Sequence, residues 1–330
     1  MDITERPSSS GKMMLFSLDS GKHLLQQVSS HLGVIPGSHE ERHFEGGEHK
    51  IRALDTVRGQ DVYLVQSLYG EPSESVNDKL IKLLFFIGGL RDAGAMRVTL
   101  YAPYLCYMRK DRRTKFQDPL SSRYSAQLLE AVGLDRLVVF DVHNIAAFEN
   151  AFRCRTVHLS IQPLLADYLA PLFANSDIVV ASPDIGGAKR VELFRERLAQ
   201  TLGRPVDSAF VEKYRRGGVV SGGRVVGDVA GRTVIILDDL IAGGTTMRRA
   251  AEAMAYAGAS AVYGAATHGL FTENAASNLS TAALSRLITS NSVSGPALPG
   301  WRDRHQVLDI SPLIAESINA LSSECNAGPA

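Results

Sequence analysis

Cysteine is scarce in this sequence, and neither sign of charge is in excess. Cys106, Cys154 and Cys325 are the three cysteines among 330 residues, and their spacing forms neither a disulfide framework nor a zinc knuckle. A reducing, cytoplasmic environment is the simplest inference. The 35 basic and 35 acidic residues give zero formal charge, so no global field would attract nucleic acid or an anionic membrane. Local clusters of charge are therefore interpreted as site chemistry.

Long hydrophobic runs and several common motifs are also missing. Segment 1–12 is polar and lacks the apolar core of a signal peptide, and the apolar run 80–90 is interrupted by Lys82 and too short to span a bilayer. We therefore expect a soluble, cytoplasmic protein. The sequence contains no G-x-x-x-x-G-K-[ST], no G-x-G-x-x-G and no G-x-S-x-G. These absences exclude a P-loop, an ordinary dinucleotide-binding turn and a hydrolase nucleophile elbow.

Short apolar runs alternate with helical patterns along both halves of the chain, which predicts an α/β fold with two mainly parallel sheets flanked by helices. The predicted strands are 13–18, 62–66, 98–101, 137–140, 178–181, 206–212, 233–237, 261–265 and 284–288. The predicted helices are 21–32, 76–93, 121–132, 161–173, 187–202, 246–257 and 312–321. At this length two domains are expected. We divide the chain into a disordered segment 1–12, domains at 13–160 and 161–310, and a C-terminal helix and tail at 311–330.

Two adjacent carboxylates and a glycine turn follow the predicted strand 233–237. Asp238 and Asp239 would lie at the carboxyl end of this strand, where open α/β sheets bind ligands. Such a pair accepts hydrogen bonds from vicinal sugar hydroxyls or holds a divalent cation. The turn Gly243-Gly244-Thr245-Thr246 lets backbone N–H groups approach an anion at a helix N-terminus. The combination predicts a ribose-phosphate site; the acidic pair alone would fit an ordinary strand–helix connection.

Three more polar segments follow predicted strands. Segment 109–113 holds four cations in five residues, beginning with Arg109 and Lys110, which suits polyphosphate but also fits a solvated basic loop. Asp141-Val142-His143 ends a strand, so His143 is a candidate metal ligand, although a lone histidine is more often structural. Asp184 precedes a diglycine turn that opens a helix, giving a second anion-ready terminus beside a carboxylate suited to a cation.

His39-Glu40-Glu41-Arg42-His43 matches the H-E-x-x-H pattern of zinc proteases. Pro36-Gly37 before it and Gly46-Gly47 after it leave no room for the supporting helix, and a third ligand is not evident. We therefore reject the protease interpretation.

In their order along the chain, these segments resemble the ribose-phosphate pyrophosphokinases, or PRPP synthetases, from about residue 14 to residue 321. The matching stretches are VRGQDVYLVQS, YAPYLCYMRKDRR, DPLSSRYSAQLLEAVGLDRLVVFDVH, VVASPDIGGAKR, VGDVAGRTVIILDDLIAGGTT and YGAATHGLF. The resemblance implies two tandem phosphoribosyltransferase-type domains with the active site between them, in homodimers or hexamers. It also implies a transferase of nucleotide biosynthesis that moves the diphosphoryl group of MgATP onto the 1-hydroxyl of ribose 5-phosphate.

The resemblance also assigns roles to residues. It implies that Phe44, Glu48, Arg109, Lys110 and His143 bind ATP in the first domain, and that His143 and Asp184 hold Mg²⁺. In the second domain, Asp184, Asp238 and Asp239 and the turn from Gly243 to Thr246 would bind ribose phosphate. The Lys-x-Arg of the family's mobile catalytic loop falls on Lys213 and Arg215, at the start of the glycine-rich segment 214–225 that we expect to be a mobile loop.

The sequence departs from the family pattern within both substrate sites. Gly46 stands where the family has an aspartate beside ATP, and Ala242 replaces the third acid of the ribose-phosphate loop. Three hypotheses are therefore carried forward. The chain makes PRPP or a related diphosphate on another ribosyl 5-phosphate, it is a catalytically weak regulatory subunit of a synthetase, or it is a type I phosphoribosyltransferase that consumes PRPP. The second full domain argues against the last.

Overall fold

The computed structural model describes residues 11–216, 219–280, 283–295 and 298–326; for 213–216, 219–223 and 324–326 the backbone alone is described. The chain divides into two compact units. Unit 1 combines the residues up to Leu159 with those from Ile310 onward, and unit 2 is Ser160–Asp309. Most of the predicted disordered segment 1–12 lies outside the described residues. In the part of the chain that is described, no helix is both long and apolar enough to cross a membrane.

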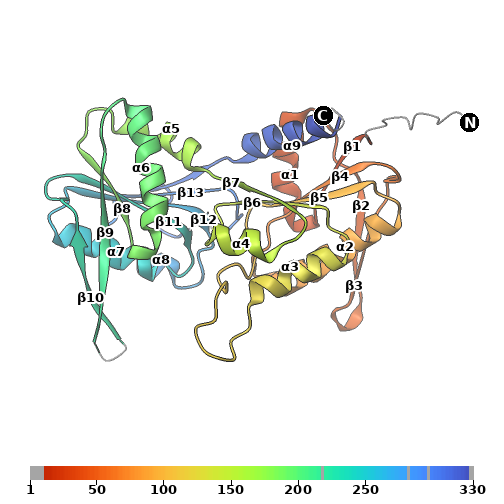
Figure 1. Cartoon of the computed structure of the whole chain (residues 1–330), viewed down its shortest axis with the longest axis horizontal. Coiled ribbons are helices and arrows are strands. Elements are labelled where there is room, and N and C mark those ends of the chain that lie inside the picture. Colours follow the sequence, from red (N-terminus) through yellow and green to blue (C-terminus); the bar gives the residue numbers. More distant parts are fainter. Residues whose placement is uncertain (1–10, 217–218, 281–282, 296–297, 327–330) are drawn as a thin grey trace, which may run out of the picture. The chain divides into compact units, whose positions relative to one another are not determined.

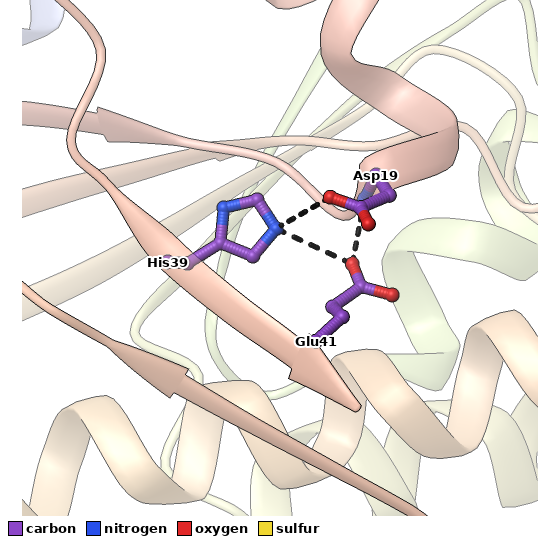
Figure 2. Close-up of side chains that lie close together, drawn as sticks. All are labelled: Asp19, His39 and Glu41. Atoms are coloured by element: carbon purple, nitrogen blue, oxygen red, sulfur yellow. Dashed lines mark hydrogen bonds and ion pairs between the residues drawn. The ribbon is translucent and has the colours of Figure 1, made fainter. Parts of the chain in front are cut away.

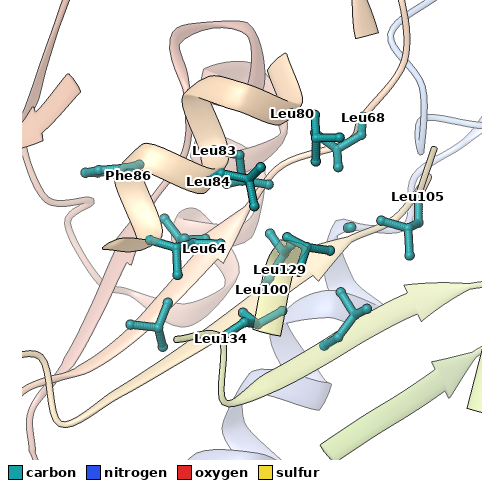
Figure 3. Close-up of a cluster of buried hydrophobic side chains, with 14 of the residues drawn as sticks. Leu64, Leu68, Leu80, Leu83, Leu84, Phe86, Leu100, Leu105, Leu129 and Leu134 are labelled. Atoms are coloured by element: carbon teal, nitrogen blue, oxygen red, sulfur yellow. The ribbon is translucent and has the colours of Figure 1, made fainter. Parts of the chain in front are cut away.

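Unit 1 is built on a parallel five-stranded sheet in the order β1-β4-β5-β6-β7. Its strands are β1 (Met13–Phe16), β4 (Asp61–Val65), β5 (Arg97–Ala102), β6 (Arg136–Phe140) and β7 (Arg155–Leu159). Connecting helices lie on one side of this sheet in Figure 1: α2 (Val76–Asp92), α3 (Ser121–Ala131) and α4 (Ile145–Ala151). Because strand side chains alternate between faces, Val62 and Leu64 point into one buried cluster with these helices. Figure 3 shows part of this cluster, including Leu64.

The opposite face of the unit 1 sheet is covered by helices from both ends of the sequence. The helix α1 (Lys22–Leu32) packs against α9 (Ser311–Asn326), and Figure 1 shows both on the side away from α2. Tyr101 of β5 is fully buried, and its hydroxyl lies 2.9 Å from the Ser317 hydroxyl of α9 at hydrogen-bonding distance. The last helix thereby completes the core of the first unit.

A separate antiparallel hairpin, β2 (His39–His43) and β3 (His49–Ala53), packs against α2. Gly46 and Gly47 at its tip have φ values of 87° and 90°, in the left-handed region that favours glycine. The H-E-x-x-H segment is the strand β2, so our rejection of a zinc-protease helix is confirmed.

Unit 2 is built on a seven-stranded sheet in the order β10-β9-β8-β11-β12-β13-β14, in which β10 is the antiparallel strand. Its strands are β8 (Ile178–Ser182), β9 (Asp207–Arg216), β10 (Val219–Val226), β11 (Thr233–Ile241), β12 (Ala261–Gly269), β13 (Arg286–Ser290) and β14 (His305–Leu308). Its helices are α5 (Gln162–Leu172), α6 (Ala188–Leu202), α7 (Thr245–Tyr256) and α8 (Ala275–Leu279). Val234 and Ile236 of β11 face the cluster of α7, while Ile235 and Leu237 face that of α5 and α6. The continuous apolar run of β11 therefore reflects burial on both faces.

The strand order of unit 2 reverses at β8. From β8 the chain passes through α6 to β9 on one side, and later returns to β11 on the other side. Ligands of open α/β sheets bind at such a switch point, outside the carboxyl ends of the strands. Asp184 follows β8, and Asp238 and Asp239 lie near the end of β11.

The segment 214–225, which we expected to be a loop, differs in the structure. Its described backbone extends β9 to Arg216 and forms β10, with a shift in register between Val220 and Gly223. The β-branched valines on both sides of the glycines favour strand pairing, and the pattern prediction undervalued them. Residues 217 and 218 lie outside the described residues.

Candidate active site

The acidic pair on β11 is the centre of the candidate site in unit 2. Arg190, from the first turn of α6, places Nη1 3.5 Å from Oδ1 of Asp238 and 3.3 Å from Oδ1 of Asp239. The backbone N–H of Asp239 also donates to Oδ1 of Asp238, at 2.9 Å. One guanidinium therefore faces two adjacent carboxylates at the topological switch point.

Burial and the second carboxyl group change the ionisation of this pair. Burial, followed by the adjacent Asp239, raises the pKa of Asp238 to about 8, while Arg190 acts in the opposite direction. Two like charges this close do not both ionise readily in a low dielectric. We therefore expect the pair to hold one proton near neutral pH when no ligand is bound.

The glycine turn after β11 is held in place by hydrogen bonds to its carbonyl oxygens. The Asn278 side-chain amide donates to Gly243 O at 2.6 Å and lies 3.3 Å from Thr245 Oγ1. The backbone N–H of Thr272 donates to Ala242 O at 3.2 Å. Gly244 has φ +74° and occupies the N-cap position of α7. Because the first-turn N–H groups of a helix have no partner within the helix, this turn presents donors to an anion.

Asp184 is positioned by the turn after β8. Its Oδ1 accepts a hydrogen bond from Gly186 N at 3.0 Å, and its backbone oxygen accepts one from Ser182 Oγ at 2.5 Å. The structure thus brings together at the switch point all the predicted site residues of unit 2 whose side chains are described: Asp184, Asp238, Asp239, Gly243, Gly244, Thr245 and Thr246. Carboxylate oxygens beside helix N-termini suit both a hard divalent cation and a phosphate group.

In unit 1, Arg109, Lys110 and His143 lie in loops at the carboxyl ends of the neighbouring strands β5 and β6. The side-chain amide of Asn144 joins these loops by donating to Asp111 Oδ2 at 2.8 Å. Arg109 and His143 are exposed. The structure therefore places three of the predicted nucleotide-binding residues at one edge of the sheet.

Lys110 differs from Arg109 because an acid within its own loop already holds it. Its Nζ donates to Asp118 Oδ2 at 2.7 Å, and Thr114 Oγ1 donates to the same oxygen at 2.6 Å. Lys110, together with Thr114 and two backbone N–H groups, keeps the pKa of Asp118 well below its ordinary value. The basic loop is thus partly neutralised internally, which the sequence pattern did not reveal.

Phe44 and Glu48 lie at the tip of the hairpin, on a different part of unit 1. The Phe44 side chain is 49% exposed, and Phe44 N donates to Glu48 O at 2.8 Å across the turn. The side chains of Lys213 and Arg215 lie outside the described residues, so the structure gives only their backbone positions on β9.

Two residues that contact the site were not predicted. Arg190 had a usable signal, since a cation in the first turn of a helix opposes the helix dipole and needs a nearby acid to offset it. Asn278 had none, because it is a single amide on the short helix α8, far along the sequence from the turn that it holds.

The doubly wound sheet of unit 2, with an acidic pair and a glycine turn at its switch point, defines a phosphoribosyltransferase-type α/β protein. Residues 13–133 match the family model described as the N-terminal domain of ribose phosphate pyrophosphokinase, and residues 221–326 match the phosphoribosyl synthetase-associated domain. The chain belongs to the ribose-phosphate pyrophosphokinase family. The predicted fold class and the predicted membership of this family of diphosphokinase-type transferases are confirmed.

Curated relatives and a crystal structure cover nearly the whole chain. Ribose-phosphate pyrophosphokinase 1 of Streptococcus mutans is 33% identical over 314 residues, covering 94% of each chain. Ribose-phosphate pyrophosphokinase of Listeria ivanovii is 32% identical over 308 residues, covering 93% of each. The phosphoribosylpyrophosphate synthetase of Mycobacterium smegmatis superimposes with a TM-score of 0.84 at 33% identity, covering 95% of this chain and 99% of that one.

Proposed function

We propose that this protein transfers the diphosphoryl group of ATP to the 1-hydroxyl of ribose 5-phosphate, giving PRPP and AMP for nucleotide biosynthesis in the cytoplasm. The 1-oxygen attacks the β-phosphorus, the bond from that phosphorus to the α,β-bridging oxygen breaks, and AMP leaves with the bridging oxygen. The observation that carries the proposal is the acidic pair Asp238–Asp239 followed by the Gly244 turn, at the switch point of a sheet in a chain of this family.

In unit 2, the residues of this turn recognise the pentose phosphate. Asp238 and Asp239 accept hydrogen bonds from the vicinal hydroxyls, and the backbone N–H groups from Gly243 to Thr246 bind the 5-phosphate. Because we expect the pair to hold one proton in the free protein, sugar binding should release that proton as both carboxylates become acceptors. Arg190 then balances the added negative charge from its position beside both carboxylates.

In unit 1, the residues at the edge of the sheet bind the nucleotide. Arg109 offers an exposed guanidinium fork to phosphate oxygens, and the half-exposed Phe44 ring with Glu48 contacts the adenosine part. Lys110 must exchange its partner Asp118 for phosphate if it is to contribute. Arg109 is therefore expected to contribute more than Lys110 to ATP affinity.

The donor chemistry fits Mg²⁺. Asp184 supplies carboxylate oxygens at the end of β8, and His143 supplies an exposed imidazole at the end of β6. An ion held by either side chain would neutralise charge on the phosphates of the nucleotide. Asp184 keeps its carboxylate oriented through Gly186 N, so the side chain is preorganised for a cation.

We propose Lys213 and Arg215 as the catalytic cations that stabilise charge developing on the β-phosphoryl group. Lys213→Ala should lower turnover by orders of magnitude with a modest loss of ATP affinity, measured by AMP release and equilibrium nucleotide binding. Arg197→Ala is the matched control, since it removes an exposed cation from α6 in the same unit. Unchanged turnover in Lys213→Ala would remove this residue from the mechanism.

The proposed reaction is tested by a coupled assay of AMP release from MgATP, first with ribose 5-phosphate and then with other ribosyl 5-phosphates. AMP release with ribose 5-phosphate supports the proposal. Release with another acceptor alone points to altered specificity, which the replacement of an acid by Ala242 favours as the second candidate. No release with any acceptor, together with binding to a second synthetase chain, would identify a regulatory subunit.

We also propose that the protein forms homodimers or hexamers, as its family resemblance implies. Sedimentation analysis of the purified chain tests this point, and a monomer at micromolar concentration would contradict it.

A further inference from the structure

Three potential metal ligands converge in unit 1, away from the residues assigned to substrates. Asp19 lies in the 3-10 turn η1 (Asp19–Gly21) before α1, while His39 and Glu41 lie on β2. Figure 2 shows the three side chains pointing toward one another. The Nε2 atom of His39 is 3.1 Å from Asp19 Oδ1 and 3.4 Å from Glu41 Oε1, and one ligand atom from each residue lies within 4.8 Å of the others.

The positions of these residues follow from local structure. Residues two apart on a strand project to the same face, so His39 and Glu41 point together from β2. The backbone N–H of Asp19 donates to Glu41 Oε1 at 2.6 Å, which brings the start of α1 to the hairpin. The side chains of His39 and Glu41 are each 5% exposed, whereas that of Asp19 is 54% exposed. The cluster is therefore enclosed by the hairpin and open to solvent on the Asp19 side.

The buried imidazole is the observation that points to a ligand. Within the described part of the chain, His39 Nε2 is buried and makes no hydrogen bond of acceptable geometry, although two carboxylate oxygens are close. An unsatisfied buried polar atom is costly and uncommon. Ligands about 2.0–2.2 Å from a zinc-like ion, at tetrahedral to octahedral angles, are separated from each other by roughly 3.0–3.5 Å. The separations from Nε2 to the two oxygens match those of a coordination shell.

We propose that Asp19, His39 and Glu41 bind a divalent transition-metal ion of the zinc class. One imidazole with two carboxylates suits Zn²⁺, and Co²⁺ as its spectroscopic substitute, better than Mg²⁺, whose ligands are mostly oxygen atoms. The exposed side of Asp19 leaves room for water to complete the shell. The site is independent of the proposed substrate-binding residues.

The surrounding charges support ligation by Glu41. The Asp19 N–H group donates to Oε1 of Glu41, and Lys82 lies beside Oε2, so both oxygens of this carboxylate are held in place. Lys82 Nζ lies 3.4 Å from Glu41 Oε2 and orients the second oxygen, while Glu74 lies 2.5 Å from the same ammonium and balances it. In metal sites, a ligating carboxylate is typically oriented by a hydrogen bond to its other oxygen.

The Lys22 ammonium must move before the metal ion can bind. Lys22 Nζ is 2.5 Å from Asp19 Oδ1, the same oxygen that faces His39. Its side chain is 55% exposed, and exposed ion pairs of this kind contribute little. Metal binding therefore requires only that Lys22 shift away from Oδ1. The alternative without a metal is His39 paired directly with both carboxylates.

The metal ion would link the turn before α1 to the β2–β3 hairpin, whose tip carries Phe44 and Glu48. Metal binding should therefore slow hydrogen exchange of the β2 and β3 amides and raise the melting temperature, with no requirement for substrate.

The test is titration of the full-length, chelator-treated protein with Zn²⁺ and, separately, Co²⁺, in the absence of nucleotide. Binding is followed by competition with a chromophoric chelator and by the visible absorption of Co²⁺. His39→Asn and Asp19→Asn are the test variants. Asp19→Asn changes an exposed ligand, so it should keep the fold even if the buried substitution His39→Asn does not. His31→Gln is the matched control, because it removes an exposed imidazole from α1.

We expect wild type and His31→Gln to bind about one equivalent more Zn²⁺ than His39→Asn and Asp19→Asn, or to bind it at least roughly 10–100-fold more tightly. Counting the difference between variants separates this site from any ion bound at His143 or Asp184. Equal stoichiometry and affinity in wild type and Asp19→Asn would overturn the proposal. So would the absence of Zn²⁺ binding by wild type at micromolar metal, which would leave the ion-paired histidine as the correct description.

Discussion

Replacing Gly244 by alanine should destabilise the protein by about 2–5 kcal/mol, because two penalties act at one atom. The backbone there has φ +74°, a left-handed conformation that costs a non-glycine residue about 1–2 kcal/mol. A Cβ would also lie 2.8 Å from Cγ and 3.1 Å from Cδ2 of Leu279. Leu279 is fully buried, so it has little freedom to move, and overpacking of this kind costs about 1–3 kcal/mol.

The neighbouring glycine provides the control. Among the residues that the structure describes, a Cβ on Gly243 would meet Thr272 Oγ1 alone, at 3.5 Å, which is an ordinary contact, and its φ is not positive. Gly243→Ala should therefore leave the free energy of unfolding within about 1 kcal/mol of wild type. If the turn binds phosphate through its backbone, the added methyl should still raise the KM for the pentose phosphate. Urea denaturation and AMP release measure the two effects separately.

A second substitution tests the steric part of the argument. Leu279→Ala alone should cost about 2–5 kcal/mol through the cavity that it creates. In the Gly244→Ala background it should cost at least about 1 kcal/mol less, because it also relieves the clash. The reasoning would be refuted if Gly244→Ala were as stable as wild type, or if the two glycine variants were equally destabilised.

Three further predictions follow from polar contacts. The raised pKa of Asp238 adds stability that is fully present below the ordinary pKa near 4 and is lost as pH rises through about 8. Asp238→Asn should flatten this pH dependence of the melting temperature, and an unchanged profile would contradict it. Asp118→Ala removes the acceptor of Lys110 and of two backbone N–H groups, so amide exchange in segment 114–118 should accelerate; unaltered exchange would argue against the loop anchor. Tyr101→Phe should lower the free energy of unfolding by about 1 kcal/mol in urea through loss of the contact with Ser317, and no change would show that this contact is neutral.

The central strands were predictable because both of their faces are buried. β8 and β11 appear in the sequence as unbroken β-branched runs, and the structure places them side by side in the sheet. The edge strands β7 and β14 were not predicted. Their residues are mostly half-buried, and their pairing comes from tertiary contacts that no local pattern reports.

Site residues, too, could be predicted where they lie in one short segment and not where tertiary packing brings them together. The acidic pair and glycine turn that we propose bind ribose phosphate could be found as one cluster, because Asp238, Asp239 and Gly244 belong to one short segment. Asn278 was not predictable, because its role arises from packing of α8 against that turn. The H-E-x-x-H match was rejected as a protease helix, yet its His39 and Glu41 meet Asp19 because the spacing that matters on a strand is two rather than four.

The placement of α9 in unit 1 has a consequence for how the protein is made. During translation Ser311–Asn326 leaves the ribosome only after the whole of Ser160–Asp309 has been synthesised. Unit 2 has every strand it needs at that moment, whereas one face of the unit 1 sheet, including Tyr101, still awaits its cover. The half of the molecule that is translated second is therefore able to mature first. Nascent chains stalled before Ser311 should expose apolar surface to chaperones until the final helix arrives.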